Sequence, residues 1–280
     1  MREKSGIEWT DTTWNPVTGC SRVSPGCEHC YAEALSLRHK WSTKPWTAQN
    51  AAENVILHPD RLGQPLKWKK PRRVFVNSMS DLFHERVPDA FLDQVFGVMA
   101  GSSHHRFQVL TKRPERMRDY VNGLADRGGS GRGFARLDAG ARSVGIALSF
   151  EKIPLVSWPI PNIWLGVSVE DQRRADERMP LLLETPAAVR FVSAEPLLGA
   201  VYLSEWLRTR NVHWVIVGGE SGPGYRPMAP AWAEKVRDDC AARGIPFFLK
   251  QLGGWPNKRG GDEAVLDGTR HTAMPGAVAC

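Results

Sequence analysis

The sequence lacks any long hydrophobic run, and this lack limits what the chain can be. No apolar stretch among its 280 residues approaches the ~20 residues that a membrane-spanning helix needs. The first residues, MREKSGIEWTDTTWNP, have a polar start but no apolar core segment, which is not the pattern of a secretory signal. We therefore expect no membrane partner.

Cysteine is also scarce, and its distribution argues against a disulfide framework. The five cysteines are an odd number, and three of them lie in one short segment of a long chain. This usage is typical of a reducing compartment, so we expect a cytoplasmic protein. A hydrophobic content of 42% and a charged content of 24% are ordinary for a globular protein.

Negative charge is in modest deficit, because 37 Lys and Arg face 30 Asp and Glu and leave a net charge of +7. This balance favours polyanionic partners such as nucleic acid. For the dense basic run Lys67–Arg73 (KWKKPRR), a solvated linker is the favoured interpretation and a nucleic-acid contact is the alternative. Among the eleven tryptophans, Trp164 and Trp214 fall in apparent strands and are expected in the core. Five early ones could line a pocket or stack on bases: Trp9, Trp14, Trp41, Trp46 and Trp68.

Short apolar runs bounded by turn residues alternate with amphipathic helical patterns. Runs without polar alternation predict parallel strands that are buried on both faces. The predicted strands are Thr13–Thr18, Arg73–Asn77, Phe107–Thr111, Ile163–Val169, Val189–Ala194, His213–Gly218 and Pro246–Lys250. The clearest helical patterns are Pro88–Ala100, Asp171–Glu184 and Pro230–Arg243. This alternation predicts an α/β protein with a single parallel (β/α) barrel or partial barrel over residues 1–280.

Two segments depart from the alternation. Residues 122–143 are rich in Gly, Arg, Asp and Ser, and they predict a flexible insertion rather than an RNA-binding Arg-Gly segment. From about residue 253 onward the periodicity fades, which predicts an irregular C-terminal tail that wraps one face of the barrel. Cys240 falls on a predicted helix and is expected to be a buried residue of the hydrophobic core with no chemical role.

The run GCSRVSPGCEHCYAE places Cys20, Cys27 and Cys30 within eleven residues. Three thiolates on one loop can hold three irons of a [4Fe–4S] cluster and leave the fourth iron open to a substrate or cofactor. A closed structural zinc site has four protein ligands instead. His29 lies between two of the cysteines and can hardly turn onto the same metal, while Cys240 and Cys280 are distant in sequence. The spacing therefore favours a chemical site over a structural one.

Polar residues follow nearly every predicted strand at its carboxyl end. In a parallel barrel these ends converge and form the active site. We expect the following side chains to surround one mouth together with the cysteines: Asn77, Ser78, Ser80, Asp81, His84, Thr111, Lys112, Arg113, Ser168, Glu170, Asp171, Ser193, Glu195, Glu220, Ser221, Lys250 and Gln251.

Seven motifs in order carry a family resemblance that covers the chain except residues 122–143. They are IEWTDTTWNPVTGCSRVSPGCEHCYAE, VFVNSMSDLFHE, FQVLTKRPERM, NIWLGVSVEDQ, RFVSAEPLLG, WVIVGGESGP and FFLKQLGGW. Together they resemble the phage-type three-cysteine-motif family of radical-SAM-like proteins, whose substrate is unknown. Radical S-adenosylmethionine (SAM) enzymes use C-x3-C-x2-C with an aromatic residue before the last cysteine. Here the first gap is six residues, and His29 occupies the aromatic position.

The resemblance implies a radical-SAM-like fold and a [4Fe–4S] cluster on Cys20, Cys27 and Cys30. The unique iron would bind SAM, and reduction by a donor such as a flavodoxin or ferredoxin would release a 5′-deoxyadenosyl radical for hydrogen abstraction. The residues expected to contact SAM are Ser78, Ser80, Asp81, Ser168 and Glu170. Glu195 and Glu220 mimic the GGE-type loop of these enzymes but come late in the chain.

Three functions remain open. In the first, the radical acts on a nucleic-acid base or nucleotide, in modification or repair, with Lys112 and Arg113 as phosphate anchors and Lys250 and Gln251 also near the substrate. In the second, the same chemistry acts on a peptide or protein. In the third, a zinc ion or cluster stabilises a non-catalytic nucleic-acid-binding protein, with His84 or Cys240 as the fourth ligand.

Overall fold

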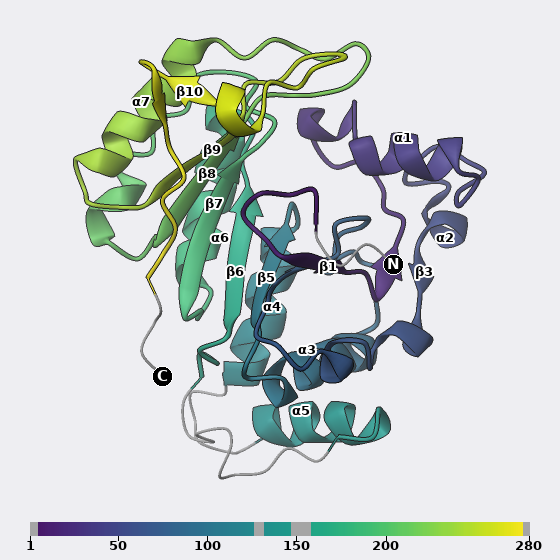
Figure 1. The fold of residues 1–280 in the computed structure, drawn as a ribbon. Helices are drawn as coiled ribbons and strands as arrows, with labels where there is room; N and C mark the ends of the chain where they lie inside the picture. The colour runs from purple at the N-terminus through teal and green to yellow at the C-terminus, as the bar shows by residue number, and fades with distance from the viewer. Residues whose placement is uncertain (1–4, 126–131, 147–157, 277–280) are drawn as a thin grey trace.

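A seven-stranded parallel sheet, curved into an open half-barrel, organises the molecule (Figure 1). The computed structural model describes residues 5–125, 132–146 and 158–276. In sheet order the strands are β1 (Thr12–Trp14), β4 (Arg73–Val76), β5 (Arg106–Thr111), β6 (Ile163–Ser168), β7 (Val189–Ala194), β8 (Trp214–Gly218) and β9 (Phe247–Gln251). β1 and β9 are the two edges of the sheet, so the barrel stays open. The predicted α/β partial barrel is confirmed.

The described helices are α1 (Tyr31–Arg38), α2 (Ala51–Asn54), α3 (Asp89–Gly101), α4 (Pro114–Ala125), α5 (Arg132–Ser143), α6 (Gln172–Glu184) and α7 (Pro230–Ala241). α3, α4, α6 and α7 cover the outer face of the sheet, and α5 packs on α3 and α4 (Figure 1). α1 and α2 lie between β2 and β3 in the chain. The 3₁₀ turns are η1 (Pro25–Cys27), η2 (Pro59–Arg61), η3 (Pro65–Lys67), η4 (Trp206–Thr209) and η5 (Gly261–Glu263). Two small ladders pair β2 (Val17–Thr18) with β3 (Ile56–Leu57) and β10 (Val265–Leu266) with β11 (Thr269–Arg270).

Alternate strand residues enter two different cores, because successive side chains of a strand point to opposite faces. The larger core lies between the sheet and its helices, and Cys240 of α7 is buried there as predicted. The smaller core fills the concave face with an aromatic layer. Trp164 and Trp214 belong to this layer and are 1% and 0% exposed, which confirms their predicted burial. Trp9 lies edge-on against Trp214, with ring centroids 5.9 Å apart.

The predicted flexible insertion over residues 122–143 is wrong for residues 122–125, which end α4, and for residues 132–143, which form the helix α5. Glycine here serves close helix packing: a Cβ on Gly140 would lie 2.3 Å from the carbonyl oxygen of Asp93 on α3. Arg136 of α5 also pairs with the Asp93 carboxylate at 2.8 Å. A composition rich in Gly and Arg therefore reflects tight helix–helix contact, while residues 126–131 lie outside the described part.

The C-terminal tail returns to the open edge of the sheet after β10 and β11. Residues 271–273 run antiparallel to β9, since Leu249 N donates to His271 O at 2.9 Å and Ala273 N donates to Phe247 O at 3.2 Å. The tail thus covers the unpaired groups of an edge strand. Within the three described segments, no helix combines the length and the apolar character needed to cross a membrane.

Candidate functional site at the mouth of the half-barrel

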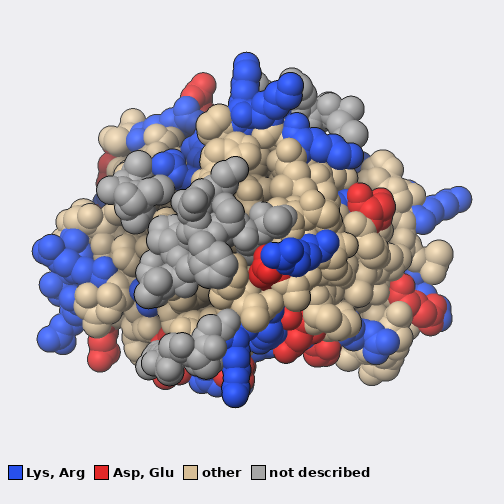
Figure 2. Space-filling view, turned by 90° about the horizontal axis from the view of Figure 1, so that it is seen from below, with Lys and Arg blue, Asp and Glu red and all other residues tan. Residues whose placement is uncertain are grey.

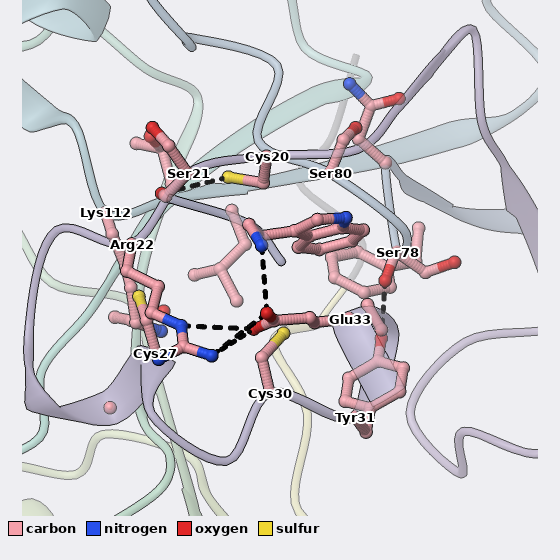
Figure 3. A pocket seen from close by; sticks show the side chains of 18 residues that line it. Cys20, Ser21, Arg22, Cys27, Cys30, Tyr31, Glu33, Ser78, Ser80 and Lys112 are labelled. Atoms are coloured by element: carbon pink, nitrogen blue, oxygen red, sulfur yellow. Dashed lines mark hydrogen bonds and ion pairs between the residues drawn. The ribbon is translucent and has the colours of Figure 1, made fainter. Parts of the chain in front are cut away.

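The loop that carries the three cysteines crosses the carboxyl edge of the sheet between β2 and α1. Cys20, Cys27 and Cys30 are free and partly buried. All three line one cavity of about 160 Å³. Figure 3 shows their sulfur atoms around this cavity, on side chains that come from different points of the loop. The sequence therefore brings three thiols to one place without a disulfide.

Glu170, which follows β6, holds this loop in position. Its side chain is fully buried, and its Oε1 accepts a hydrogen bond from Ser24 Oγ at 2.7 Å. Its Oε2 accepts one from Arg178 Nη1 at 3.0 Å, and Lys112 Nζ lies 3.6 Å from Oε1. Gly26 packs directly on the Glu170 side chain. We expected Glu170 to contact SAM, but the structure engages both of its oxygens with the protein.

Substituting Gly26 by alanine should displace the cysteine loop. The new Cβ would lie 2.3 Å from Glu170 Cγ, and Glu170 has no freedom to retreat because it is buried and paired. Overpacking of this kind costs about 1–3 kcal/mol, and thermal unfolding should report it. Gly199→Ala is the matched control, since nothing lies within 4 Å of its Cβ position. Equal unfolding temperatures for the two variants would contradict the close packing.

Arg113 supports Cys20 from behind the cavity. Its Nη1 lies 3.5 Å from Cys20 Sγ and 3.3 Å from Asp81 Oδ2, and its Nη2 donates to Ser21 O at 3.1 Å. Asp81 also accepts hydrogen bonds from Thr111 Oγ1 at 2.7 Å and from the Lys112 amide at 2.9 Å. Both side chains are thus used within the protein. The expected roles of Arg113 as a phosphate anchor and of Asp81 as a SAM contact stay predictions.

Positive charge lies beside the buried thiols. Burial raises the pKa of Cys20 to about 12, and the Arg113 guanidinium opposes that rise. Burial also raises the pKa of Cys30, against the backbone amides of Glu33 and Ala32. Burial acts to lower the pKa of Lys112, but Glu170 and the cysteines outweigh it and the pKa rises. Because metal ligation requires thiolates, nearby cations favour the ligating form.

The side chains proposed as a fourth metal ligand are engaged elsewhere. His84 Nδ1 accepts a hydrogen bond from the Arg86 amide at 3.1 Å, so Nε2 carries the proton and donates to Ser21 Oγ at 2.9 Å. Burial and the charge of Arg113 lower the pKa of His84 to about 4, and the ring is neutral. Cys240 is buried in the helix-side core. In the part of the chain that the structure describes, no three His, Cys, Asp or Glu side chains are grouped as ligands of one metal ion.

The cavity wall contains a polar group without a partner. Asn77 is 3% exposed, its backbone φ is 60°, and its Oδ1 accepts from Val17 N at 3.3 Å. Its Nδ2 has no hydrogen-bond partner among the described residues. Trp46 Nε1, in the same wall, is buried and equally unpaired. A buried donor left unpaired costs about 1–3 kcal/mol, so these atoms suit a polar ligand in the cavity.

The mouth continues from this cavity towards the ends of β7, β8 and β9. The second part has a volume of about 150 Å³ and shares Cys30, Lys112 and Ser168 with the first. Here Lys250 forms an ion pair with Glu195. Glu220 accepts hydrogen bonds from the Arg226 side chain and lies 3.0 Å from His29 Nδ1. His29 therefore points away from the thiols, as its place between two cysteines predicts.

Comparison with known proteins gives one family. A family model described as "Protein of unknown function (DUF5131)" matches residues 4–275. The chain belongs to this family. No curated protein and no solved structure matches the chain. Because the DUF5131 match spans nearly the whole chain, the half-barrel and the cysteine loop are parts of one family unit.

In this DUF5131 protein, the predicted site residues separate into two groups, apart from Asp171, whose side chain caps α6. One group lines the mouth with the cysteines: Asn77, Ser78, Ser80, Thr111, Lys112, Ser168, Ser193, Glu195, Glu220, Ser221, Lys250 and Gln251. The other group, Asp81, His84, Arg113 and Glu170, lies behind the loop and supports it. Sequence reasoning missed Tyr31, which lines both parts of the mouth and donates to Ser78 O at 2.6 Å. Nothing in the sequence beyond its place next to Cys30 marks that residue.

Proposed function

We propose that the mouth of the half-barrel binds a [4Fe–4S] cluster through Cys20, Cys27 and Cys30, together with SAM, as radical-SAM enzymes do. The observation that carries this proposal is the set of three free thiols on one loop that line a single cavity at the carboxyl edge of a parallel sheet. A cubane cluster offers a separate iron to each thiolate, so its ligands need not converge on one ion. When bound, the cluster and SAM would supply a 5′-deoxyadenosyl radical for hydrogen abstraction.

The polar groups of the first cavity suit the amino-acid end of SAM. Lys112, which reaches both parts of the mouth, would attract a carboxylate. Asn77 Nδ2 is a buried donor that such a ligand would satisfy. The hydroxyls of Ser78, Ser80 and Ser168 can donate or accept. These side chains would bind and orient the cofactor beside the cysteine loop.

The remaining part of the mouth suits the substrate. Its floor includes Trp9, Phe75 and Leu110, and apolar walls exclude water from a reactive site. Its rim carries the Glu195–Lys250 pair and Gln251. We propose a nucleic-acid base or nucleotide as the substrate because the chain has a net charge of +7, with a peptide as the alternative. A flavodoxin or ferredoxin would supply the electron.

Anaerobic reconstitution with iron and sulfide tests the proposal. The iron-loaded protein should form 5′-deoxyadenosine from SAM when a strong reductant is added. Lys112→Met should weaken SAM binding by about tenfold or more, since a hydrogen bond to a charged group contributes about 1.5–3 kcal/mol. Its iron content should stay unchanged, and Lys258→Met, at an exposed position, is the control. Iron-loaded protein that neither binds nor cleaves SAM would refute the proposal.

A further inference from the structure

A larger cavity, of about 490 Å³, lies at the opposite edge of the sheet, where β4, β5 and β6 begin. Arg72, Arg73 and Arg106 line it, with Asp11 and Trp164 among the other wall residues. The aromatic layer of the concave face separates it from the mouth, because Trp164 of that layer lines this cavity. Cavities of about 300–1,000 Å³ accommodate ligands. This site is therefore distinct from the cysteine site.

Positive charge exceeds negative charge in this cavity, with three guanidinium groups against one carboxylate. Arg73 pairs with Asp11, with Nη2 2.7 Å from Oδ1. Arg72 and Arg106 form no ion pair with any described residue and lie over aromatic rings instead. Arg72 Cζ is 5.4 Å from the Trp68 ring centroid, and Arg106 Cζ is 6.0 Å from the Trp164 ring centroid. The rings hold both guanidinium groups in place without neutralising them.

The basic run of the sequence leads directly into this cavity. Lys67, Lys69 and Lys70 are exposed and precede Arg72, and none of them pairs with an acid of the described segments. The run lies at the amino end of β4 and hence on the edge of the sheet away from the cysteines. Figure 2 looks at the molecule from below and shows Lys and Arg side chains around much of its margin, with Asp and Glu among them. Residues 67–73 carry five Lys and Arg side chains, which is more positive charge than one phosphate group would bind.

We propose that this edge binds the phosphodiester backbone of a single-stranded nucleic acid, with Arg72 and Arg106 on one phosphate and the lysines on its neighbours. Guanidinium forks match phosphate oxygens, and a recessed cavity admits one strand more readily than a duplex. This inference does not rest on the cluster or on SAM. A mononucleotide or free phosphate could also bind to Arg72 and Arg106, but it would offer no neighbouring phosphates to the lysines.

Titration of a short labelled single-stranded oligonucleotide at several salt concentrations tests the proposal. The double variant Arg72→Gln/Arg106→Gln should bind at least tenfold more weakly at low salt. Its slope of log affinity against log salt should fall by about 0.7, because the two arginines share one phosphate and each phosphate contact on a single strand contributes about 0.7. Arg208→Gln/Arg243→Gln removes the same charge from exposed positions near β8 and β9 and should bind like the parent. Parent protein that fails to bind at low salt, or a double variant that binds like it, would overturn the proposal.

Further binding measurements distinguish a single strand from a small anion and from a duplex. ATP or inorganic phosphate that competes as well as the strand would reassign the cavity to a small anion, and equal or tighter duplex binding would remove the single-strand assignment. Lys69→Gln/Lys70→Gln leaves the cavity intact and should also weaken binding, which keeps the test valid if the arginine variant unfolds. The arginine variant should retain its iron and its SAM binding, so a failure of the cluster proposal leaves this result unchanged.

Discussion

Replacing any one of Cys20, Cys27 and Cys30 by alanine should abolish iron binding, whereas Cys240→Ala should still take up about four irons per chain, as one [4Fe–4S] cluster requires. The three thiols of the loop line one cavity, and a cluster with only two protein thiolates would lose an anchor. Cys240 is buried among helix-side core residues and faces no part of that cavity. Iron and sulfide analysis after anaerobic reconstitution, with absorption spectra, measures the effect.

The Cys240→Ala control also separates ligand loss from misfolding, because it removes a buried thiol without touching the loop. Thermal unfolding of all four variants should show that the loop variants stay folded without metal. Uptake of one zinc per chain and no iron would contradict the cluster and favour a metal-stabilised binding protein. Full iron retention in any of the three loop variants would remove that cysteine from the ligand set.

Most strands of the sheet were predictable because they are buried on both faces, whereas the predicted strand Thr13–Thr18 divides into β1 of the sheet and β2 of a separate ladder. Val189–Ala194 is predicted and observed with the same bounds, and Ile163–Val169 differs from β6 by one residue. Continuous apolar character requires cover on both sides, and in this chain the helices and the aromatic layer provide it. The position of the mouth follows, since parallel strands end at one edge. The curvature that leaves β1 and β9 at opposite edges, unpaired with each other, has no local signal of this kind.

The side of the loop on which each polar residue lies was not predictable. Lys112 and Arg113 are adjacent at the end of β5, yet Lys112 lines the mouth and Arg113 lies behind Cys20. Successive residues of a strand point to opposite sides, so an error of one position in register exchanges their roles. The prediction for residues 132–143, which form α5, failed for another reason. Its glycines resemble those of a loop in composition, and only the contact of Gly140 with α3 shows that they serve packing.

Arg113→Met should destabilise the fold by about 3–5 kcal/mol, the usual cost of breaking a buried ion pair from one side. Arg113 is 9% exposed and Asp81 is 6% exposed. Without the guanidinium, Asp81 would keep a buried negative charge with neutral hydrogen-bond donors, and the Ser21 carbonyl would lose a donor at 3.1 Å. Chemical denaturation gives the free energy of unfolding, and iron analysis reports the position of Cys20.

A second substitution separates charge from packing. Adding Asp81→Asn to Arg113→Met removes the unpaired carboxylate, and it should recover part of the lost free energy while the Cys20 sulfur still lacks its donor at 3.5 Å. Arg118→Met is the partly exposed control, because within the described segments Arg118 pairs with the exposed Asp119 and Glu184 and should change stability little. If Arg113→Met unfolds like the parent, the ion pair does not hold the loop. If stability falls and iron binding survives, Arg113 supports the fold and Cys20 keeps its place without it.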